Sequence, residues 1–132
     1  MEYLLDTNHA SKLLEGNESI VSKVAVLKNS GSRFSISTSI LGELFFAVYA
    51  SKRKEENLSQ LKDFIEDIIL WAYDATAAEE FGKIQAEQKT KGKPIPSIDS
   101  QIAAVARVHN LTVLTADQHF NLINGLSIEN WL

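Results

Sequence analysis

Four acidic residues in this chain share a setting in which their neighbours are apolar enough to be buried. They are Asp6, Glu43, Asp99 and Asp117. Asp6 and Asp117 each close a short apolar run, whereas Glu43 and Asp99 each lie inside an apolar helical pattern. Because carboxylates are seldom placed among buried side chains unless their charge is paired, these four are the first candidates for chemistry.

Grouped carboxylates have few stable arrangements. Two of them about 4 Å apart repel by about 4 kcal/mol at an effective dielectric constant of about 20, so such a group either takes up protons or holds a cation. An all-oxygen ligand set in a chain without cysteine favours Mg²⁺ or Mn²⁺ over Zn²⁺. An ion held in this way orients and helps to ionise a water molecule for attack on phosphorus. We therefore expect the four acids to converge on a divalent metal ion and a phosphodiester.

Three of the four acids also have an ordinary structural explanation. Asp6 is a suitable cap for the first helix, Asp99 would interact favourably with a helix dipole, and Asp117 is a common turn former. Taken alone, Asp6 and Asp99 favour these structural interpretations. Glu43 does not, because it follows Ser39 by four residues rather than three, which excludes a capping box with that serine.

The elements that must position these acids are short strands that alternate with helices. Hydrophobic patterns predict strands at residues 2–5, 34–37, 111–115 and 126–128, and residues 70–73 fit either a further strand or a helix. Helices are expected at about residues 9–15, 18–28, 40–49, 56–69, 75–90 and 98–108, with Thr38 or Ser39 capping the third and Ser97 capping the last. This alternation indicates an α/β domain with a largely parallel central sheet. Residues 1–132, with no internal repeat or linker, are expected to form one domain.

Ligands of parallel α/β sheets bind beyond the carboxyl ends of the strands. Asp6 and Asp117 follow predicted strands and should lie at this edge. Glu43 lies about one turn into the helix after the second strand, and Asp99 lies in the first turn of its helix. The predicted fold therefore gives all four acids a common edge, although the pattern does not show that their side chains touch.

Composition narrows the classes of function. The absence of cysteine excludes disulfides, thiolate zinc sites and cysteine nucleophiles, and it fits a reducing compartment. The most continuous apolar stretch, residues 44–50, falls far short of the ~20 residues that a membrane span needs, and no signal-like segment opens the chain. We expect a soluble cytoplasmic protein. A net charge of −4 argues against non-specific nucleic-acid binding through overall charge, but a local basic strip stays possible.

In the order of its motifs, the sequence resembles the PIN-domain ribonucleases and, within them, the VapC-type toxins of toxin–antitoxin pairs. The matching segments are Leu4-Leu5-Asp6-Thr7-Asn8, Ser39 through Gly42-Glu43-Leu44, Ile95-Pro96-Ser97-Ile98-Asp99-Ser100-Gln101-Ile102-Ala103-Ala104, and Val113-Leu114-Thr115-Ala116-Asp117 with Phe120 and Trp131 behind it. Together they span nearly the whole chain. No single motif is strong, but the ordered set is fairly specific.

The resemblance implies a PIN-like three-layer α/β/α sandwich with a four- or five-stranded, mostly parallel sheet. It also implies an Mg²⁺- or Mn²⁺-dependent endoribonuclease that leaves 3′-hydroxyl and 5′-phosphate ends. By the same carry-over Asp6, Glu43, Asp99 and Asp117 are the catalytic residues that hold the metal. Asn8 and Thr115 would support them by orienting carboxylates or water.

Two positions depart from the family pattern. Some relatives carry a further acid beyond the last of these strands, where this chain has His119 and Asn121, so the number of metal ions stays open. His9 stands where an aliphatic residue is more usual. It could contact substrate, but we favour a partly exposed structural histidine.

Two surface regions are candidates for partners. Lys91 and Lys93 precede Asp99 and could contact RNA phosphates, whereas the basic residues 52–54 are better explained as a solvated turn. The helix over residues 40–49 carries apolar side chains on more than one face, which fits either burial on two sides or a groove beside the helix over residues 56–69. The resemblance favours a groove for an antitoxin peptide, with a homodimer or higher-assembly contact elsewhere.

Other classes of function fit less well. A haloacid-dehalogenase-like phosphatase would need an aspartate at Asn8, and a receiver-like domain would need paired acids after the first strand and a lysine after the last. An RNA-processing or decay nuclease, or a non-catalytic binding module on the same fold, remains an alternative. Four mutually repelling acids argue against the binding module, and the small size favours the toxin.

Overall fold

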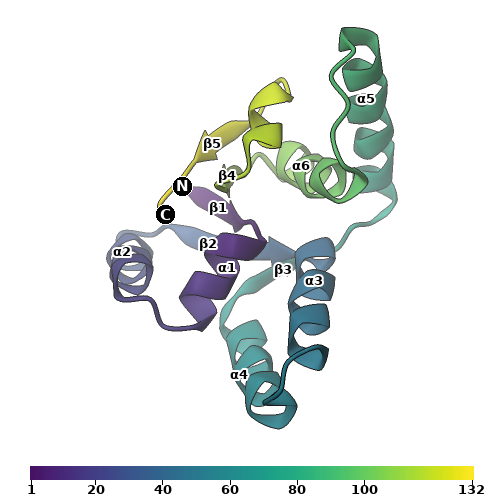
Figure 1. The fold of residues 1–132 in the computed structure, drawn as a ribbon. Helices are drawn as coiled ribbons and strands as arrows, with labels where there is room; N and C mark the ends of the chain where they lie inside the picture. Colours follow the sequence, from purple (N-terminus) through teal and green to yellow (C-terminus); the bar gives the residue numbers. More distant parts are fainter.

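Five short parallel strands form one central sheet in the computed structural model, which describes all 132 residues. The strands are β1 (Glu2–Leu5), β2 (Arg33–Ser37), β3 (Ile69–Trp71), β4 (Thr112–Leu114) and β5 (Ser127–Glu129). They lie in the order β3-β2-β1-β4-β5 (Figure 1). In this register Tyr3 of β1 is opposite Phe34 of β2 and Thr112 of β4. The expected parallel sheet is confirmed, with five strands rather than four.

Six α-helices flank the sheet. They are α1 (Thr7–Leu14), α2 (Glu18–Asn29), α3 (Thr38–Tyr49), α4 (Lys54–Asp67), α5 (Ala75–Lys91) and α6 (Ser97–His109). From β1 to β3 the chain moves toward one edge of the sheet, and from β3 to β4 it crosses back over the sheet to the other side of β1. Because crossovers between parallel strands are right-handed, this change of direction places α5 and α6 on the face opposite α1 and α2 (Figure 1). The three-layer prediction is confirmed. No helix combines the length and the apolar character needed to cross a bilayer.

The core is centred on β1 and α6. Leu4 and Leu5 of β1 are fully buried, as expected for a central strand covered on both faces. Residues 102–106 of α6 are all buried, and three of them are alanines, which let this helix lie close to its neighbours. The burial of these two elements fixes the positions of the residues that follow β1 and begin α6.

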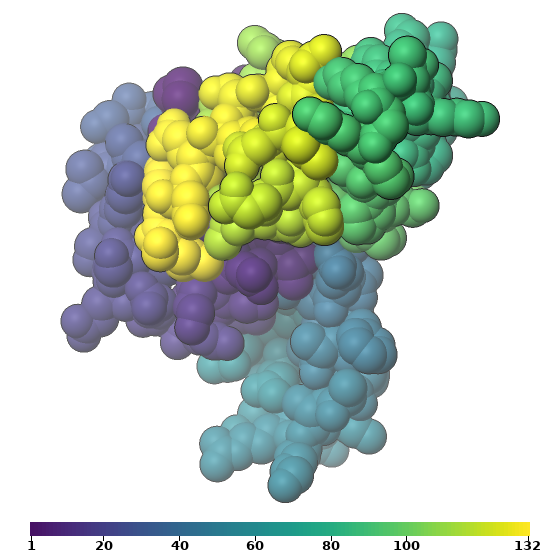
Figure 2. Space-filling view, turned by 45° about the horizontal axis from the view of Figure 1, so that its top comes forward, coloured from purple at the N-terminus to yellow at the C-terminus, as the bar shows by residue number.

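The C-terminal segment covers the amino-terminal strands. Figure 2 shows the last residues (yellow) beside the N-terminal part of the chain (purple). The Trp131 ring lies 5.2 Å from that of Tyr3 and 5.9 Å from that of Phe34, measured between centroids. Its backbone N–H donates to His9 Nε2 at 3.0 Å, so the end of the chain is tied to β1, β2 and α1.

Several element boundaries differ from the prediction for local reasons. Ser37, rather than Thr38 or Ser39, caps α3 by accepting the N–H of Ile40 at 3.4 Å. Ser97 is the first residue of α6 rather than its cap, because Pro96 takes that place. The helix expected over residues 56–69 begins at Lys54 and ends at Asp67, since the backbone is already extended one residue later.

Candidate metal-binding active site

Asp6 and Asp117 come together because β1 and β4 are neighbours in the sheet. Asp6 directly follows β1, and its backbone N–H donates to the carbonyl of Leu114 at 2.9 Å. Beyond the end of β4, Thr115 Oγ1 donates to Asp6 Oδ2 at 2.8 Å and accepts the N–H of Asp117 at 2.9 Å. One buried hydroxyl therefore links both aspartates. The other carboxylate oxygen of Asp6 accepts the N–H of Thr7 at 2.7 Å and caps α1.

Glu43 reaches the same edge from α3. It is exposed, and its Oε1 accepts a hydrogen bond from Thr7 Oγ1 at 2.7 Å. Near the start of the same helix, Ser39 Oγ donates to Gln101 Oε1 at 2.9 Å. This bond joins α3 to α6, the helix that carries the next acid of the group.

Asp99 and Asp117 face each other across the imidazole of His119. His119 Nδ1 lies 3.0 Å from Asp99 Oδ2 and 3.0 Å from Asp117 Oδ1. One ligand atom from each of the three side chains falls within a group no wider than 4.8 Å. The loop holds this arrangement, because the His119 backbone N–H also donates to Asp117 Oδ1 at 2.9 Å where the 3₁₀ helix η1 (Gln118–Leu122) begins.

The charges of these acids disturb one another. Burial raises the pKa of Asp99 to about 6, and the negative charge of Asp117 adds to this effect. Burial also raises the pKa of Asp6, with smaller contributions from Glu43 and Asp117, while the hydrogen bonds from Thr115 and Thr7 oppose the rise. The charges of Glu43 and Asp117 thus act on Asp6, and those of Asp117 and Asp6 act on Asp99, so the four acids are close in space.

His119 offsets part of this repulsion. Its hydrogen bond with Asp99 raises the pKa of the imidazole, and the charge of Asp117 acts in the same direction. Burial alone would raise the pKa of Asp117, but hydrogen bonds and charge from His119 outweigh it and leave that pKa below its usual value. A divalent cation would relieve the same repulsion, and carboxylate oxygens are the donors that such ions prefer. The side chains present therefore fit a divalent metal.

The expected supporting residues have different positions. Thr115 donates to Asp6, as expected of a residue that orients a carboxylate. Asn8 is exposed on the first turn of α1, and its neighbour Thr7 is the residue that contacts Glu43. Lys91 and Lys93 are exposed where α5 leads toward α6, and Lys91 Nζ donates to the carbonyl of Leu122 at 3.2 Å.

Three contacts of the site were not expected from the sequence. The hydroxyl of Thr7 could have been considered, because it lies between the two polar residues that were singled out. The sequence indicated the contacts of His119 only weakly, because it showed a histidine where some relatives have an acid and gave no reason for it to contact Asp99. Nothing in the sequence indicated the Ser39–Gln101 bond, because these residues are 62 apart.

His9 is a structural residue. Its side chain is fully buried rather than partly exposed, and Nε2 accepts the backbone N–H of Trp131. Burial lowers the pKa of His9 to about 4, so the ring is neutral at pH 7. Because solvent cannot reach it, contact between His9 and a substrate is excluded in this conformation.

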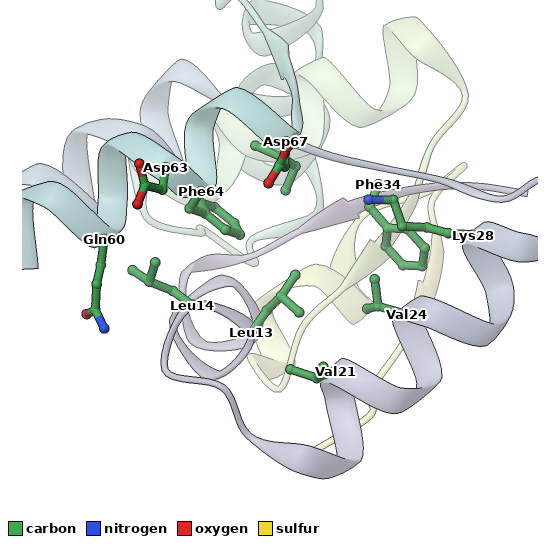
Figure 3. Close-up of a pocket in the computed structure, with 11 residues that line it drawn as sticks. Leu13, Leu14, Val21, Val24, Lys28, Phe34, Gln60, Asp63, Phe64 and Asp67 are labelled. Carbon is green, nitrogen blue, oxygen red and sulfur yellow. The ribbon is translucent and has the colours of Figure 1, made fainter.

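An apolar groove lies away from the acids, between α1, α2 and α4 (Figure 3). Its volume is about 400 Å³. Leu13, Val24 and Phe64 line it from the three helices, and Asp63 and Asp67 lie on its α4 side. A smaller hollow of about 160 Å³ lies between α3 and α4, where the sequence predicted a groove, and α1 also contributes to it. The larger groove was therefore not the one expected.

A parallel α/β/α sandwich with acids at one edge, two of them after β1 and β4 and two on α3 and α6, defines the PIN-like class of domains. The model of the family described as PIN domain matches residues 3–126. The chain belongs to this family.

The relatives are VapC proteins. The tRNA(fMet)-specific endonuclease VapC of Shigella flexneri is 32% identical to this chain over 99% of it and 98% of the relative. Ribonuclease VapC2 of Rickettsia felis is 30% identical, with the same coverage of both chains. Among solved structures, VapBC2 from Rickettsia felis, bound to a DNA fragment from its promoter, contains a chain that matches with a TM-score of 0.92 and 30% identity. That match covers all of both chains.

Proposed function

We propose that this protein is a metal-dependent endoribonuclease and the toxin of a VapC-type toxin–antitoxin pair. The observation that carries the proposal is the convergence of Asp6, Glu43, Asp99 and Asp117 at one sheet edge, with the pKa values of Asp6 and Asp99 raised there. The full-length similarity to proteins named endonuclease and ribonuclease supports RNA as the substrate.

The four acids would hold Mg²⁺ or Mn²⁺, since their ligand atoms are mainly carboxylate oxygens. Bound there, such an ion supplies activation of a water nucleophile and compensates the negative charge of the phosphodiester. Asp6 is oriented by Thr115 and Thr7, and Glu43 is oriented by the Thr7 hydroxyl. These hydrogen bonds keep the carboxylates at fixed positions at the edge of the sheet.

Residues around the acids would contact the RNA substrate. Asn8 is exposed on the first turn of α1, where its amide would orient a carboxylate or water once substrate is in place. Lys93 is exposed in the segment before α6 and would pair with a phosphate. Lys91 would contribute in the same way, although part of its hydrogen-bonding capacity is used by Leu122.

The partner would be a cognate antitoxin, as the VapBC assemblies of the structural relatives suggest. We place its apolar segment in the groove between α1, α2 and α4 (Figure 3). The groove is apolar at its centre and carries Lys28 on its α2 side and Asp63 and Asp67 on its α4 side. The two carboxylates fit a segment with apolar side chains and a basic residue next to α4. The exposed Phe46 and Tyr49 on α3 are candidates for a contact between two copies of the chain.

Cleavage of labelled RNA by the purified, antitoxin-free chain tests the enzymatic part of this proposal. Activity should require Mg²⁺ or Mn²⁺ and disappear with a chelator. Glu43→Gln should remove it, whereas Glu79→Gln should not, because both residues are exposed helical glutamates but Glu79 lies on α5 away from the acids. Equal activity of the two variants would overturn the assignment of the site.

Growth of host cells in which expression of this chain is induced tests the toxin part of the proposal. Expression of the chain alone should arrest growth, and expression of Glu43→Gln should not. Normal growth with folded, active protein would instead favour an RNA-processing or decay nuclease.

A further inference from the structure

The acidic site of this chain contains one nitrogen donor, His119, which lies beside Asp99 and Asp117. Its Nδ1 lies 3.0 Å from an oxygen of Asp99 and 3.0 Å from an oxygen of Asp117. The imidazole is therefore in contact with both carboxylates, while 46% of the side chain stays open to solvent. The loop sets this orientation, because the backbone N–H of the same histidine is held by Asp117.

The spacing of His119 Nδ1 from each of the two carboxylate oxygens suits a shared ion, and all three ligand atoms lie within 4.8 Å of one another. Two donors that occupy adjacent positions of an octahedron, each about 2.1 Å from the metal, lie about 3.0 Å apart. The site is also open enough to exchange an ion, since the exposed fractions are 14% for the Asp99 side chain, 35% for Asp117 and 46% for His119. The histidine forms the outer side of the group, and Asp99 lies deeper.

We propose that His119 Nδ1 is a metal ligand in this protein and that it makes the centre prefer a first-row transition ion to Mg²⁺. Carboxylate oxygen suits Mg²⁺ and Mn²⁺ alike, whereas imidazole nitrogen is a softer donor that transition ions accept more readily than Mg²⁺. The inference rests on the proposed function, because it uses the same acids for the metal site.

A different role for His119 makes a different prediction. Histidines often donate a hydrogen bond to a carboxylate that binds the metal, without touching the ion themselves. In that arrangement the imidazole would orient Asp99 and Asp117 but give no nitrogen contact to the metal. The two roles can therefore be separated by a measurement that detects nitrogen bound directly to the ion.

Pulsed electron paramagnetic resonance with Mn²⁺ as the probe makes this measurement on the full chain. The wild-type protein should show ¹⁴N coupling from one directly bound imidazole, and His119→Gln should lose it. His109→Gln is the matched control, because this histidine stacks on Trp71 at the opposite end of α6 with ring centroids 3.9 Å apart. The control should keep the coupling. Thermal unfolding should show that all three proteins are folded.

Competition between the two ions gives a second readout. The ratio of Mn²⁺ to Mg²⁺ affinity should fall by about tenfold or more in His119→Gln. Mutation of a residue that only supports a metal ligand already lowers metal affinity by about tenfold or more, and loss of a ligand should have at least this effect. If Mn²⁺ binds to the wild type and is lost in Asp99→Asn, but no ¹⁴N coupling is seen, His119 is not a ligand and only this inference fails. If Mn²⁺ does not bind, or binds equally to Asp99→Asn, the metal site of the proposed function fails with it.

Discussion

Asp6 is both a helix cap and a member of the acidic group. One carboxylate oxygen accepts the N–H of Thr7 at the start of α1, and the other accepts the Thr115 hydroxyl. Each oxygen has a further lone pair, so both bonds leave capacity for a metal ion. Capping and metal binding, which sequence patterns present as alternatives, are therefore compatible at this residue.

Thr115 should matter because one hydroxyl serves two aspartates. In Thr115→Val the carboxylate of Asp6 loses a donor and the N–H of Asp117 loses its acceptor. We expect kcat for RNA cleavage to fall by about 10–100-fold, as for other residues that orient metal ligands. The free energy of unfolding should fall by about 1 kcal/mol.

The matched control for this threonine is Thr90→Val. The Thr90 hydroxyl is exposed and donates only to the carbonyl of Ala86 within its own helix, at 3.1 Å. Steady-state cleavage assays and urea denaturation should find this variant close to wild type. Unchanged kcat in Thr115→Val would mean that the hydroxyl does not position the acids.

Asp99 should cost stability when no metal is bound. Its pKa is raised from 3.8 to about 6, so the folded protein holds a proton that the unfolded chain releases between these pH values. Stability contributed by Asp99 is therefore lost as pH rises through this window. In the presence of a chelator at pH 7, the free energy of unfolding of Asp99→Asn should exceed that of wild type by about 1–3 kcal/mol.

Urea denaturation at two pH values checks this sign. The difference between Asp99→Asn and wild type should be present at pH 7 and should fall well below about 1 kcal/mol near pH 4, where the folded carboxyl is protonated and the unfolded one is close to half protonated. A variant that is less stable than wild type at pH 7 without metal would show that the acids do not repel one another as the structure indicates.

At the scale of the elements, the link between α1 and the end of the chain should depend on pH. His9 is buried and neutral, with its pKa lowered from 6.5 to about 4, so protons bind preferentially to the unfolded chain between these values. Stability contributed by His9 is therefore complete above about pH 6.5 and is lost as pH falls toward 4. The loss should reach about 3 kcal/mol at most.

The variant His9→Gln isolates this effect. Glutamine can still accept the N–H of Trp131 but does not titrate. Wild type should therefore gain stability relative to the variant as pH rises from about 4 to 6.5. Denaturation at several pH values measures this difference in the free energy of unfolding. A difference that is constant across this range would contradict a buried neutral imidazole.

Element types were predictable from the sequence, whereas their contacts were not. Short apolar runs such as residues 2–5 and 34–37 define strands locally, and Asn110 ends α6 in a left-handed conformation, as its type suggested. The strand order depends on which runs pair across the sheet, and an apolar run carries little information about its neighbour. Whether Thr7 or Asn8 faces Glu43 depends on the rotation of α1, which two adjacent polar residues do not reveal.

At the scale of the whole molecule, the chain separates its two proposed contacts. The acids lie at the carboxyl edge of the sheet. The apolar groove lies between α1, α2 and α4 (Figure 3). Helix α1 connects them, since Thr7 at its start contacts Glu43 and Leu13 near its end lines the groove. The groove and the acids thus lie at opposite ends of α1, so a partner seated in the groove need not contact the acids.

A charge placed in the groove should weaken antitoxin binding and leave RNA cleavage unchanged. Val21 of α2 lines the groove and is 38% exposed, so Val21→Glu should fold. We expect calorimetry with the cognate antitoxin to show at least about tenfold weaker binding, since burying an unpaired carboxylate costs more than 1.4 kcal/mol. RNA cleavage by the free variant should equal that of wild type.

Val26→Glu is the control for that experiment. It lies on the same helix, is 64% exposed and does not line the groove, so antitoxin binding should be unchanged. Equal binding by both variants would place the antitoxin elsewhere on the molecule.

The most direct test of the central claim is a crystal structure of the full chain grown with Mn²⁺, with anomalous scattering used to locate the ion. We predict an anomalous peak at the carboxyl edge of the sheet, contacted by carboxylate oxygens of Asp6, Asp99 and Asp117. An anomalous peak elsewhere, or ordered acids without one at millimolar Mn²⁺, would contradict the assignment of these residues to a metal-dependent site.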